Sequence, residues 1–321
     1  MTSTAANILR SGGLVAFPTE TVYGLGADAT NASAVAKIFA AKGRPATNPL
    51  IVHTANIEVA RRYANHWPDN AEKLAQSFWP GPISLVVKKA DCIAENVSAG
   101  RDTVGLRVPN HPMALQMLRK FDGPVAAPSA NRSNRISPTT AEHVRMELGN
   151  QVDLILDGGP CLVGIESTVL DLSGDTPTIL RPGGISRLQI EQIIGPVLLF
   201  TGAVAINVAA QSPGQSDVHY SPTTPACRFD GDHRKAMMGK VSKLVSCGFI
   251  FVETAIEIDR PHSNRIITLP CDPANYARNL YAALRAMDEQ HLAEIYIELP
   301  PDEAQWAAVR DRIIRATKPA P

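Results

Sequence analysis

Four polar side chains that can bind an anion stand close together in the segment AKGRPATNPLIVH, residues 41-53. They are Lys42, Arg44, Asn48 and His53, and two prolines separate them. The segment follows a stretch with helical spacing, and the carbonyl oxygens at a helix C-terminus favour cations. Alone, Lys42 and Arg44 therefore predict only charges that complement the helix dipole. Beside further donors, an ammonium and a guanidinium would instead bind phosphate or carboxylate.

Three further polar clusters stand near the ends of predicted strands. The first, PTETVYGLG (18-26), gathers hydroxyls, a carboxylate and two glycines in one predicted turn. The second, RDTVGLRVPN (101-110), has Thr103 and Arg107 at either end of a short strand. The third, APSANRSNRISP (127-138), is a loop with Ser129, Asn131, Ser133 and Ser137. Strand ends of an open α/β sheet converge on one crevice, so these clusters, with Arg181, predict a site for a nucleotide and an acidic small molecule.

The chain lacks the two common phosphate-binding motifs, GxxxxGK[ST] and a GxGxxG that opens a helix after a strand. No spacing argues for a Ser-His-Asp or Cys-His nucleophile. We therefore expect side chains and loop amides to hold the nucleotide. Catalysis would then depend on positioning and electrostatics and not on a covalent enzyme intermediate.

Alternation of short apolar runs with helical periods predicts an α/β domain over residues 1-200. The predicted strands are 14-17, 50-53, 83-87, 104-108, 124-128, 152-157 and 167-172, and the predicted helices are 32-42, 56-64, 69-78, 111-121, 139-148 and 186-194. Asn31 is the predicted cap of the helix at 32-42. A segment poor in large apolar residues, 201-225, reads as an interdomain linker.

A second, smaller α/β domain is expected over 226-321. Its predicted strands lie in FIFVE (249-253), RIITLP (265-270) and AEIYIEL (293-299), and its predicted helices at 232-246, 273-290 and 302-316.

The composition of the chain limits its function in three ways. Lys plus Arg equal Asp plus Glu at 31 each, which weakens a pure nucleic-acid-binding reading. Five scattered cysteines form no C-x-x-C pair, so we expect free thiols and no zinc site. No signal peptide or membrane span is expected, which favours the cytoplasm.

Six ordered motifs resemble a known family. They are FPTETVYGLG, KIFAAKGRPATNPL, WPGPISLVV, GLRVPNHP, APSANRS and GIESTVLDL followed by ILRPG. Their order is similar to that of the YrdC-like threonylcarbamoyl-AMP synthases, whose KxR and SxN signatures correspond here to Lys42-Gly43-Arg44 and Ser129-Ala130-Asn131. The resemblance covers about 8-195, and the rest resembles the long, two-domain form. Three departures from the family pattern are present. Ser84 replaces a usual threonine, Asn134 replaces a usual glycine, and Gln215-Ser216-Asp217-Val218 lacks the basic residue often found in the family's lid.

The resemblance implies a YrdC-like twisted mixed sheet with a concave substrate cleft, a linker, and a smaller Rossmann-like C-terminal α/β domain. It implies an enzyme, a nucleotidyltransferase that makes threonylcarbamoyl-AMP and pyrophosphate from L-threonine, bicarbonate or carbon dioxide, and ATP. Mg²⁺ is expected to accompany ATP, with no metal site made by the protein. The product is expected to pass to the proteins that form threonylcarbamoyladenosine in tRNAs reading ANN codons. Direct contact with tRNA stays open.

By the same resemblance, two groups of residues form the site. The threonine pocket is expected from Thr21, His53, Arg107, Ala127 and Ser167. The ATP site is expected from Lys42, Arg44, Asn48, Thr103, Ser129, Asn131, Ser137, Arg181, His219 and Tyr220. Lys42 and Arg44 are the expected catalytic residues, leaving the helix end to reach phosphates, while the prolines turn the chain so that His53 faces the amino acid. Glu20 would orient the threonine ammonium, act as a base or cap a turn.

The segment SPGQSDVHYSP (212-222) resembles the family's loop over the active site, and a lid that excludes water is favoured over a plain tether. Two other functions compete with the synthase. One is a non-catalytic RNA-binding module, against which the neutral charge and few aromatic residues count. The other is a different carbamoyl transferase, whose relatives resemble longer chains with cysteine-rich zinc motifs. Threonine-dependent release of pyrophosphate from ATP distinguishes all three.

Overall fold

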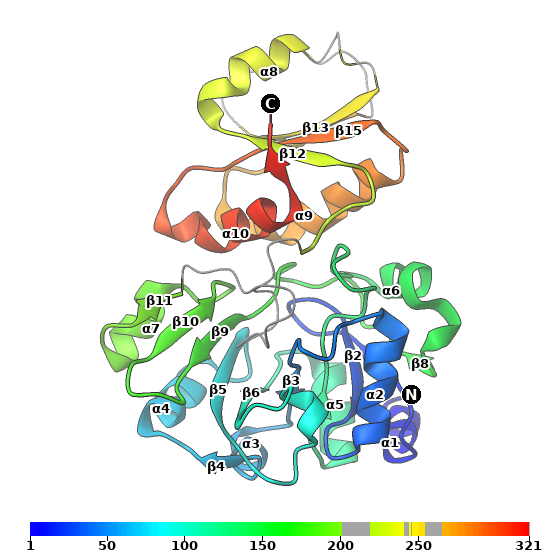
Figure 1. Ribbon diagram of the computed structural model, residues 1–321, viewed down its shortest axis with the longest axis vertical. Helices are drawn as coiled ribbons and strands as arrows, with labels where there is room; N and C mark the ends of the chain where they lie inside the picture. The colour runs from blue at the N-terminus through cyan, green and yellow to red at the C-terminus, as the bar shows by residue number, and fades with distance from the viewer. Residues whose placement is uncertain (201–218, 241–243, 245, 254–264, 321) are drawn as a thin grey trace. The chain divides into compact units, whose positions relative to one another are not determined.

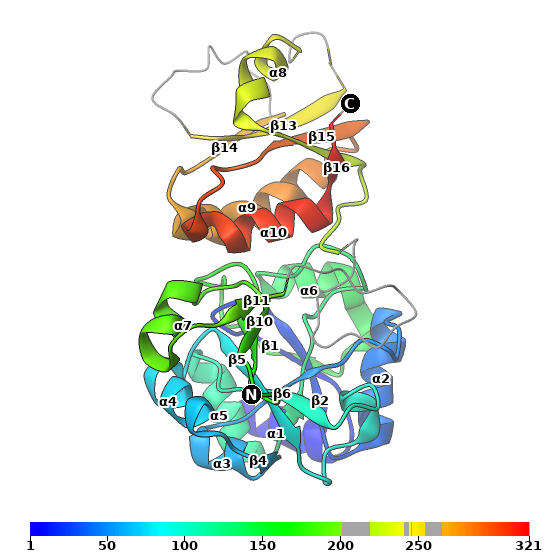
Figure 2. The ribbon, with the colours of Figure 1, turned by 60° about the vertical axis from the view of Figure 1, so that its left-hand side comes forward.

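The computed structural model describes residues 1–200, 219–240, 244, 246–253 and 265–320 of the chain. The chain forms two compact units, shown in two views in Figures 1 and 2. Unit 1 comprises Met1–Ser133, Ser137–Leu162 and Glu166–Asp217. Unit 2 comprises Asn134–Ile136, Val163–Ile165 and Val218–Pro321. In the part of the chain that the structure describes, no helix is both long enough and apolar enough to cross a membrane.

Unit 1 is built on an 11-stranded mixed sheet. The strands are β1 Val15–Phe17, β2 Gly24–Asp28, β3 Ile51–His53, β4 Ala64–His66, β5 Ile83–Lys89, β6 Thr103–Arg107, β7 Val125–Ala126, β8 Leu154–Ile155, β9 Thr168–Asp171, β10 Thr178–Arg181 and β11 Leu198–Leu199. Their order is β11-β10-β9-β5-β6-β3-β7-β2-β1-β8, with β4 paired to β5. The central pairs β3·β6 and β5·β9 are parallel, whereas β5·β6 is antiparallel.

Helices pack on this sheet. They are α1 Thr2–Arg10, α2 Ala32–Lys42, α3 Ile57–Arg61, α4 Asp69–Phe78, α5 Pro112–Phe121, α6 Ala141–Leu148 and α7 Arg187–Ile194, with short 3-10 turns at Glu95–Val97 and Gly149–Gln151. Helices α1 and α5 pack together, as do α4 and α7 (Figure 1). The predicted cap of α2 is confirmed, because the Asn31 side chain accepts from Ala34 N. The helix ends at Gly43 with φ 59°, a left-handed conformation that glycine adopts without strain.

The alternation of side chains along β5 and β6 sets the face that carries the polar residues. Leu85 and Val87 of β5, with Val104 and Leu106 of β6, belong to the main hydrophobic core. Their neighbours in sequence therefore point to the opposite face of the sheet. These neighbours are Ser84 and Val86 on β5 and Thr103, Gly105 and Arg107 on β6.

Unit 2 is built on a five-stranded parallel sheet. Its strands are β12 Ala226–Phe229, β13 Cys247–Val252, β14 Ile266–Leu269, β15 Glu294–Glu298 and β16 Lys318–Pro319, in the order β14-β13-β15-β12-β16. Its helices are α8 Arg234–Lys240, α9 Pro273–Asp288 and α10 Ala307–Ala316, with 3-10 turns at Gly231–His233 and Ala304–Trp306. Helices α9 and α10 lie on one face of this sheet and α8 on the other in both views (Figures 1 and 2).

The predicted fold class is confirmed in both units, and most predicted elements are observed within a few residues. The predicted turn at 18-26 is wrong in its second half, because residues from Gly24 onward form β2. This strand has low β propensity, but a side chain at Gly26 would lie 2.7 Å from Val125 Cγ1 and 2.9 Å from the Phe17 ring. Helix α1 and strands β10, β11, β12 and β16 were not predicted. The predicted helix at 56-64 ends at Arg61, and β4 follows.

Candidate functional site

The polar face of the sheet brings residues from β3, β5 and β6 into two adjacent rows. In the first row, His53 of β3 pairs with Arg107 of β6, and Ser84 is the next residue across on β5. In the second row, Ile51 and Val86 both pair with Gly105. The first row is polar and the second is apolar, so one continuous surface offers a charged end and an apolar end.

Arg107 is held at the charged end by a buried ion pair with Glu20. Its Nη2 donates to Glu20 Oε1 at 2.7 Å and to the Thr21 hydroxyl at 2.9 Å, and Arg107 and Glu20 are each only 4 % exposed. The second carboxylate oxygen of Glu20 accepts from Asn110 N at 2.9 Å. Within the described part of the chain, the buried Nε of Arg107 has no hydrogen-bond partner. An unsatisfied N–H on a fixed guanidinium is suited to an incoming carboxylate.

His53 lies beside Arg107 and packs edge-on against Phe17, with ring centroids 5.8 Å apart. Burial, and then the charge of Arg107, lower the pKa of His53 from 6.5 to about 3. The ring is therefore neutral at ordinary pH. Its Nδ1 is buried without a hydrogen-bond partner among the described residues, which leaves a polar atom for a ligand.

We expect this neutral histidine to make stability depend on pH. Between pH 6.5 and about 3 the unfolded chain binds a proton at His53 that the folded chain does not. Stability is therefore lost as the pH falls through that window, by up to about 1.4 kcal/mol per pH unit. Urea unfolding at about pH 7 and about pH 5 should show a larger loss for the natural chain than for His53→Gln. Equal losses in the two proteins would contradict the shifted pKa.

Serine hydroxyls and Arg181 complete the charged end. Ser84 and Ser167 hydrogen-bond through their hydroxyls at 2.9 Å. Arg181, at the end of β10, donates from Nε and Nη2 to Ser167 O at 3.2 Å and 3.0 Å. Ala127 follows β7, and its backbone N donates to Ile51 O at 2.8 Å. Three residues predicted to bind the substrate threonine, Thr21, His53 and Arg107, thus lie together. Ser167 is connected to this group through its hydrogen bond with Ser84.

Lys42 reaches from the end of α2 to the SxN loop. Its Nζ donates to Ser129 O at 2.5 Å, to Asn131 O, and to Asn131 Oδ1 at 3.4 Å. Burial, and then the Arg44 charge, lower the pKa of Lys42 well below its usual value, whereas Glu147 and Glu166 raise it. A negatively charged ligand beside Lys42 would favour the charged form of the amine and so offset the effect of burial on its pKa. The helix end, the KxR signature and the SxN signature are therefore one cluster.

Arg44 shapes the turn that leads into β3. Its Nε donates to Asn48 O at 3.2 Å and its Nη2 to Pro49 O at 3.0 Å. Asn48 Oδ1 is buried without a hydrogen-bond partner in the described ranges. The carbonyl oxygens of Asn48 and Pro49 thus hold the Arg44 guanidinium, and the side-chain amide oxygen of Asn48 remains for a ligand.

Ser137 meets a carboxylate that the sequence analysis did not select. Its hydroxyl donates to Glu166 Oε1 at 2.5 Å, and both residues are buried. Glu166 belongs to the GIESTV motif, whose serine alone was chosen. Its charge also acts on Lys42. Glu166 therefore connects Ser137 to the KxR cluster.

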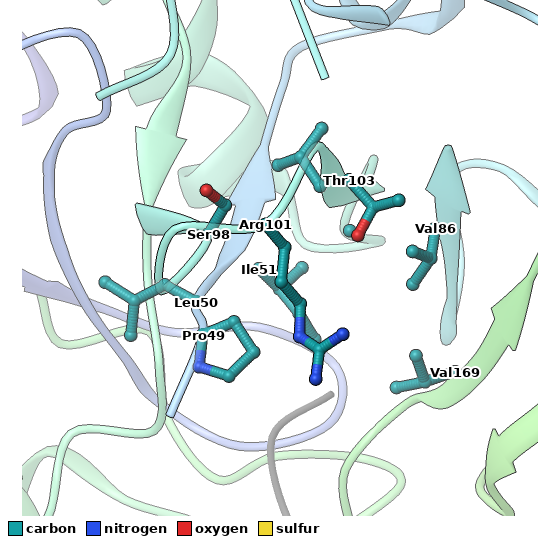
Figure 3. A pocket seen from close by; sticks show the side chains of 10 residues that line it. Pro49, Leu50, Ile51, Val86, Ser98, Arg101, Thr103 and Val169 are labelled. Carbon is teal, nitrogen blue, oxygen red and sulfur yellow. The ribbon is translucent and has the colours of Figure 1, made fainter. Parts of the chain in front are cut away.

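A small open pocket lies at the apolar end of the polar face. It is lined by Pro49, Leu50, Ile51, Val86, Ser98, Arg101, Thr103, Val104, Gly105 and Val169. Figure 3 shows the Arg101 guanidinium between Pro49 on one side and Val86 and Val169 on the other. Gly105 adds no side chain between Ile51 and Val86, which keeps the floor open. Arg101 was missed by the sequence analysis, although it begins the quoted segment RDTVGLRVPN.

Two predicted ATP residues belong to the other compact unit. His219 and Tyr220 belong to unit 2, where their rings pack at 4.0 Å and Tyr220 lies under the Arg312 guanidinium at 5.2 Å. Most of the predicted lid, residues 212-218, lies outside the described residues. Among those described, no group of three His, Cys, Asp or Glu side chains lies close enough to hold a metal ion.

Two family models match the sequence. One, described as telomere recombination and named for Sua5, YciO and YrdC, matches residues 7–183. The other, described as the C-terminal domain of threonylcarbamoyl-AMP synthase, matches residues 185–317. The likeness to these models thus extends through nearly the whole chain.

Curated relatives and solved structures are similar over the same length. The threonylcarbamoyl-AMP synthase of Bacillus subtilis is 40% identical, covering 97% of this chain and 91% of its own. That of Pyrococcus abyssi is 39% identical, covering 98% and 93%. The structure of P. abyssi Sua5 complexed with L-threonine has a TM-score of 0.90 at 36% identity, covering 99% of this chain and 95% of that chain. Both compact units therefore have counterparts in these proteins.

Proposed function

The chain belongs to the threonylcarbamoyl-AMP synthase family, and from this we propose that unit 1 joins L-threonine, bicarbonate or carbon dioxide, and ATP into L-threonylcarbamoyl-AMP and pyrophosphate. The observation that carries the proposal is the polar face itself, where a carboxylate-binding arginine and an apolar pocket lie in neighbouring rows. Such a surface can bind an amino acid and a nucleoside next to each other.

The threonine carboxylate would bind Arg107 at its unpartnered Nε, with Thr21, the neutral His53 and the Ser84–Ser167 pair around the rest of the molecule. Ala127 would contribute its backbone. We assign Glu20 the role of fixing the guanidinium, because both of its carboxylate oxygens already accept hydrogen bonds. This role differs from the ammonium ligand or base that the sequence suggested as alternatives.

The adenosine of ATP would enter the pocket, between apolar walls and under the Arg101 guanidinium, with the Thr103 hydroxyl at its edge. Its phosphates would reach Lys42 and Arg44, with Asn48, Ser129, Asn131, Ser137 and Arg181 as further donors. His219 and Tyr220 of unit 2 stay proposed nucleotide contacts of the lid. Mg²⁺ would arrive with ATP, held by phosphate oxygens and water, and would neutralise charge on the leaving pyrophosphate.

In the chemical step, an oxygen of the threonine carbamate forms a bond to the α-phosphorus, and the bond from that phosphorus to the bridging oxygen breaks as pyrophosphate leaves. Lys42 and Arg44 would stabilise the charge that develops on the phosphate oxygens. Burial of both cations strengthens this effect, because little water screens them. No covalent enzyme intermediate is needed.

The product would serve the formation of threonylcarbamoyladenosine at position 37 of tRNAs that read ANN codons. We propose that the cytoplasm is the place of reaction and that separate transfer proteins take the adenylate. This proposal asks for no tRNA contact by the chain, which agrees with its formal net charge of zero.

Pyrophosphate release by the purified chain tests the function directly. With ATP, Mg²⁺ and bicarbonate, we expect release to require L-threonine and to be about tenfold or more slower with L-serine, which lacks the methyl group. Omission of bicarbonate in degassed buffer is the matched control and should stop release. Release without an amino acid, or none together with tight RNA binding, would contradict the synthase and favour one of the two rival functions.

A further inference from the structure

Unit 2 includes two short segments that interrupt the sequence of unit 1. They are Asn134–Ile136 and Val163–Ile165, and the long segment from Val218 to the C-terminus completes the unit. The residue that follows the first segment is Ser137, and the residue that follows the second is Glu166. These two residues belong to unit 1 and hydrogen-bond to each other at 2.5 Å. The two segments therefore end at the same polar contact.

The first segment, Asn134–Ile136, is hydrogen-bonded at each end to a residue from the C-terminal part of unit 2. Asn134 has φ 63°, a conformation that asparagine tolerates better than most residues, and its carbonyl oxygen accepts from Ser221 N at 2.9 Å. This explains why asparagine can replace the family's usual glycine. The nearly buried Arg285 of α9 donates from Nη2 to the carbonyl oxygen of Ile136, directly before Ser137.

Arg135 ties the middle of this segment to the same helix. Its Nη2 contacts the Thr223 hydroxyl and lies 3.9 Å from Asp288 Oδ2 at the end of α9. The Asp288 carboxylate also accepts from Thr223 N at 2.8 Å and from Thr224 N at 2.7 Å. Helix α9 therefore holds the loop at two points.

The second segment crosses α9 at close range. A side chain on Gly164, which has φ 80°, would lie 2.4 Å from Arg278 Cα and 2.7 Å from Ala277 O. Only glycine fits both the conformation and the approach. The chain directly before Glu166 is thus placed by helix backbone.

We propose that unit 2 acts as a clamp that sets the ATP end of the site, with Arg285 as its main positioning residue. By holding the carbonyl oxygen of Ile136, Arg285 places the Ser137 hydroxyl against Glu166. The inference rests on the proposed function, because it takes Ser137 as a nucleotide contact. It assigns unit 2 its main part in ATP affinity, since Arg107, Glu20 and Thr21 make no hydrogen bond to either segment within the described part of the chain.

Calorimetric titration of the full chain with ATP and, separately, with threonine tests this inference. Arg285→Met should weaken ATP binding about tenfold, which is the usual loss when a charged hydrogen bond is removed, and leave threonine binding within about twofold. Arg135→Ala, at a half-exposed position where the fold is expected to survive, should weaken ATP binding about threefold. Arg234→Met is the matched control, because it removes a partly buried ion pair of unit 2 with Glu298 at 2.6 Å.

The control should lower thermal stability and leave both affinities within about twofold. The clamp is overturned if Arg285→Met binds ATP normally, or if Arg234→Met weakens ATP binding as much as Arg285→Met does. If Arg285→Met does not fold, the ATP affinity of Arg135→Ala tests the clamp instead. Threonine-dependent pyrophosphate release by the natural chain is measured alongside. Its absence despite ATP binding would reject the proposed function, whereas normal release with no selective effect of Arg285→Met or Arg135→Ala would reject only the clamp.

Discussion

Arg107→Met is expected to lower kcat/KM for threonine by about a hundredfold to a thousandfold, the usual loss when one partner of a buried charged pair is truncated. The reason is the guanidinium that Glu20 and Thr21 fix with one N–H still unsatisfied. Methionine keeps the apolar stem and removes every donor. Initial rates of pyrophosphate release at varied threonine and saturating ATP measure the effect, and a KM for ATP that stays within about twofold confirms its location.

Stability separates the ligand role of Arg107 from its structural role. Arg107→Met leaves the Glu20 carboxylate buried without its ion-pair partner, which costs roughly 3 to 5 kcal/mol in the free energy of unfolding. The double variant Glu20→Met with Arg107→Met removes that buried charge and should recover most of this loss, measured by urea unfolding. Activity should stay lost. Recovery of both stability and threonine affinity in the double variant would show that Arg107 does not bind the amino acid.

Lys42→Met is expected to lower kcat about a hundredfold to a thousandfold, as loss of one preorganised transition-state donor usually does. Lys42 is the last residue of α2, and its Nζ donates hydrogen bonds to Ser129 O and Asn131 O of the SxN loop. Lys37→Met is the matched control on the same helix, since Lys37 donates to Gly12 O at 2.6 Å and is otherwise exposed.

Single-turnover rates with both substrates saturating separate the chemical step from binding. The control variant should match the natural chain in rate, and both variants should unfold at similar temperatures. A Lys42→Met protein with a normal single-turnover rate and a raised KM for ATP would limit Lys42 to ground-state binding.

The sequence predicted the elements that follow simple periodic rules. Helix α2 obeys helical spacing behind an asparagine cap, so both its existence and its start at Ala32 were predictable. The apolar alternation of β5 and β6 also predicted strands there. The same period of two places Ser84 and Arg107 opposite the apolar residues of their own strands, but that they are neighbours follows only from the register of β5 with β6.

Features that depend on distant contacts were not predictable. Strand β2 contains two glycines and forms through its pairing with β1 and β7, where Val125 and Phe17 leave no room for a side chain at Gly26. The partner of Glu20 stands 87 residues away on β6, so no local pattern distinguishes an ion-pair partner from a base. The same holds for Glu166 and for the two segments in unit 2, whose places are set by α9 and not by their own sequence.

Burial of the site's cations has a consequence for competition inside a cell crowded with RNA. Lys42, Arg44, Arg107 and Arg181 are each less than 9 % exposed, and the chain as a whole carries no formal net charge. A buried cation cannot contact the phosphates of a rigid polyanion at the protein surface. A chain without net charge also releases few counterions when nucleic acid approaches. Only a small anion can enter, so cellular RNA should inhibit the enzyme little even at low ionic strength.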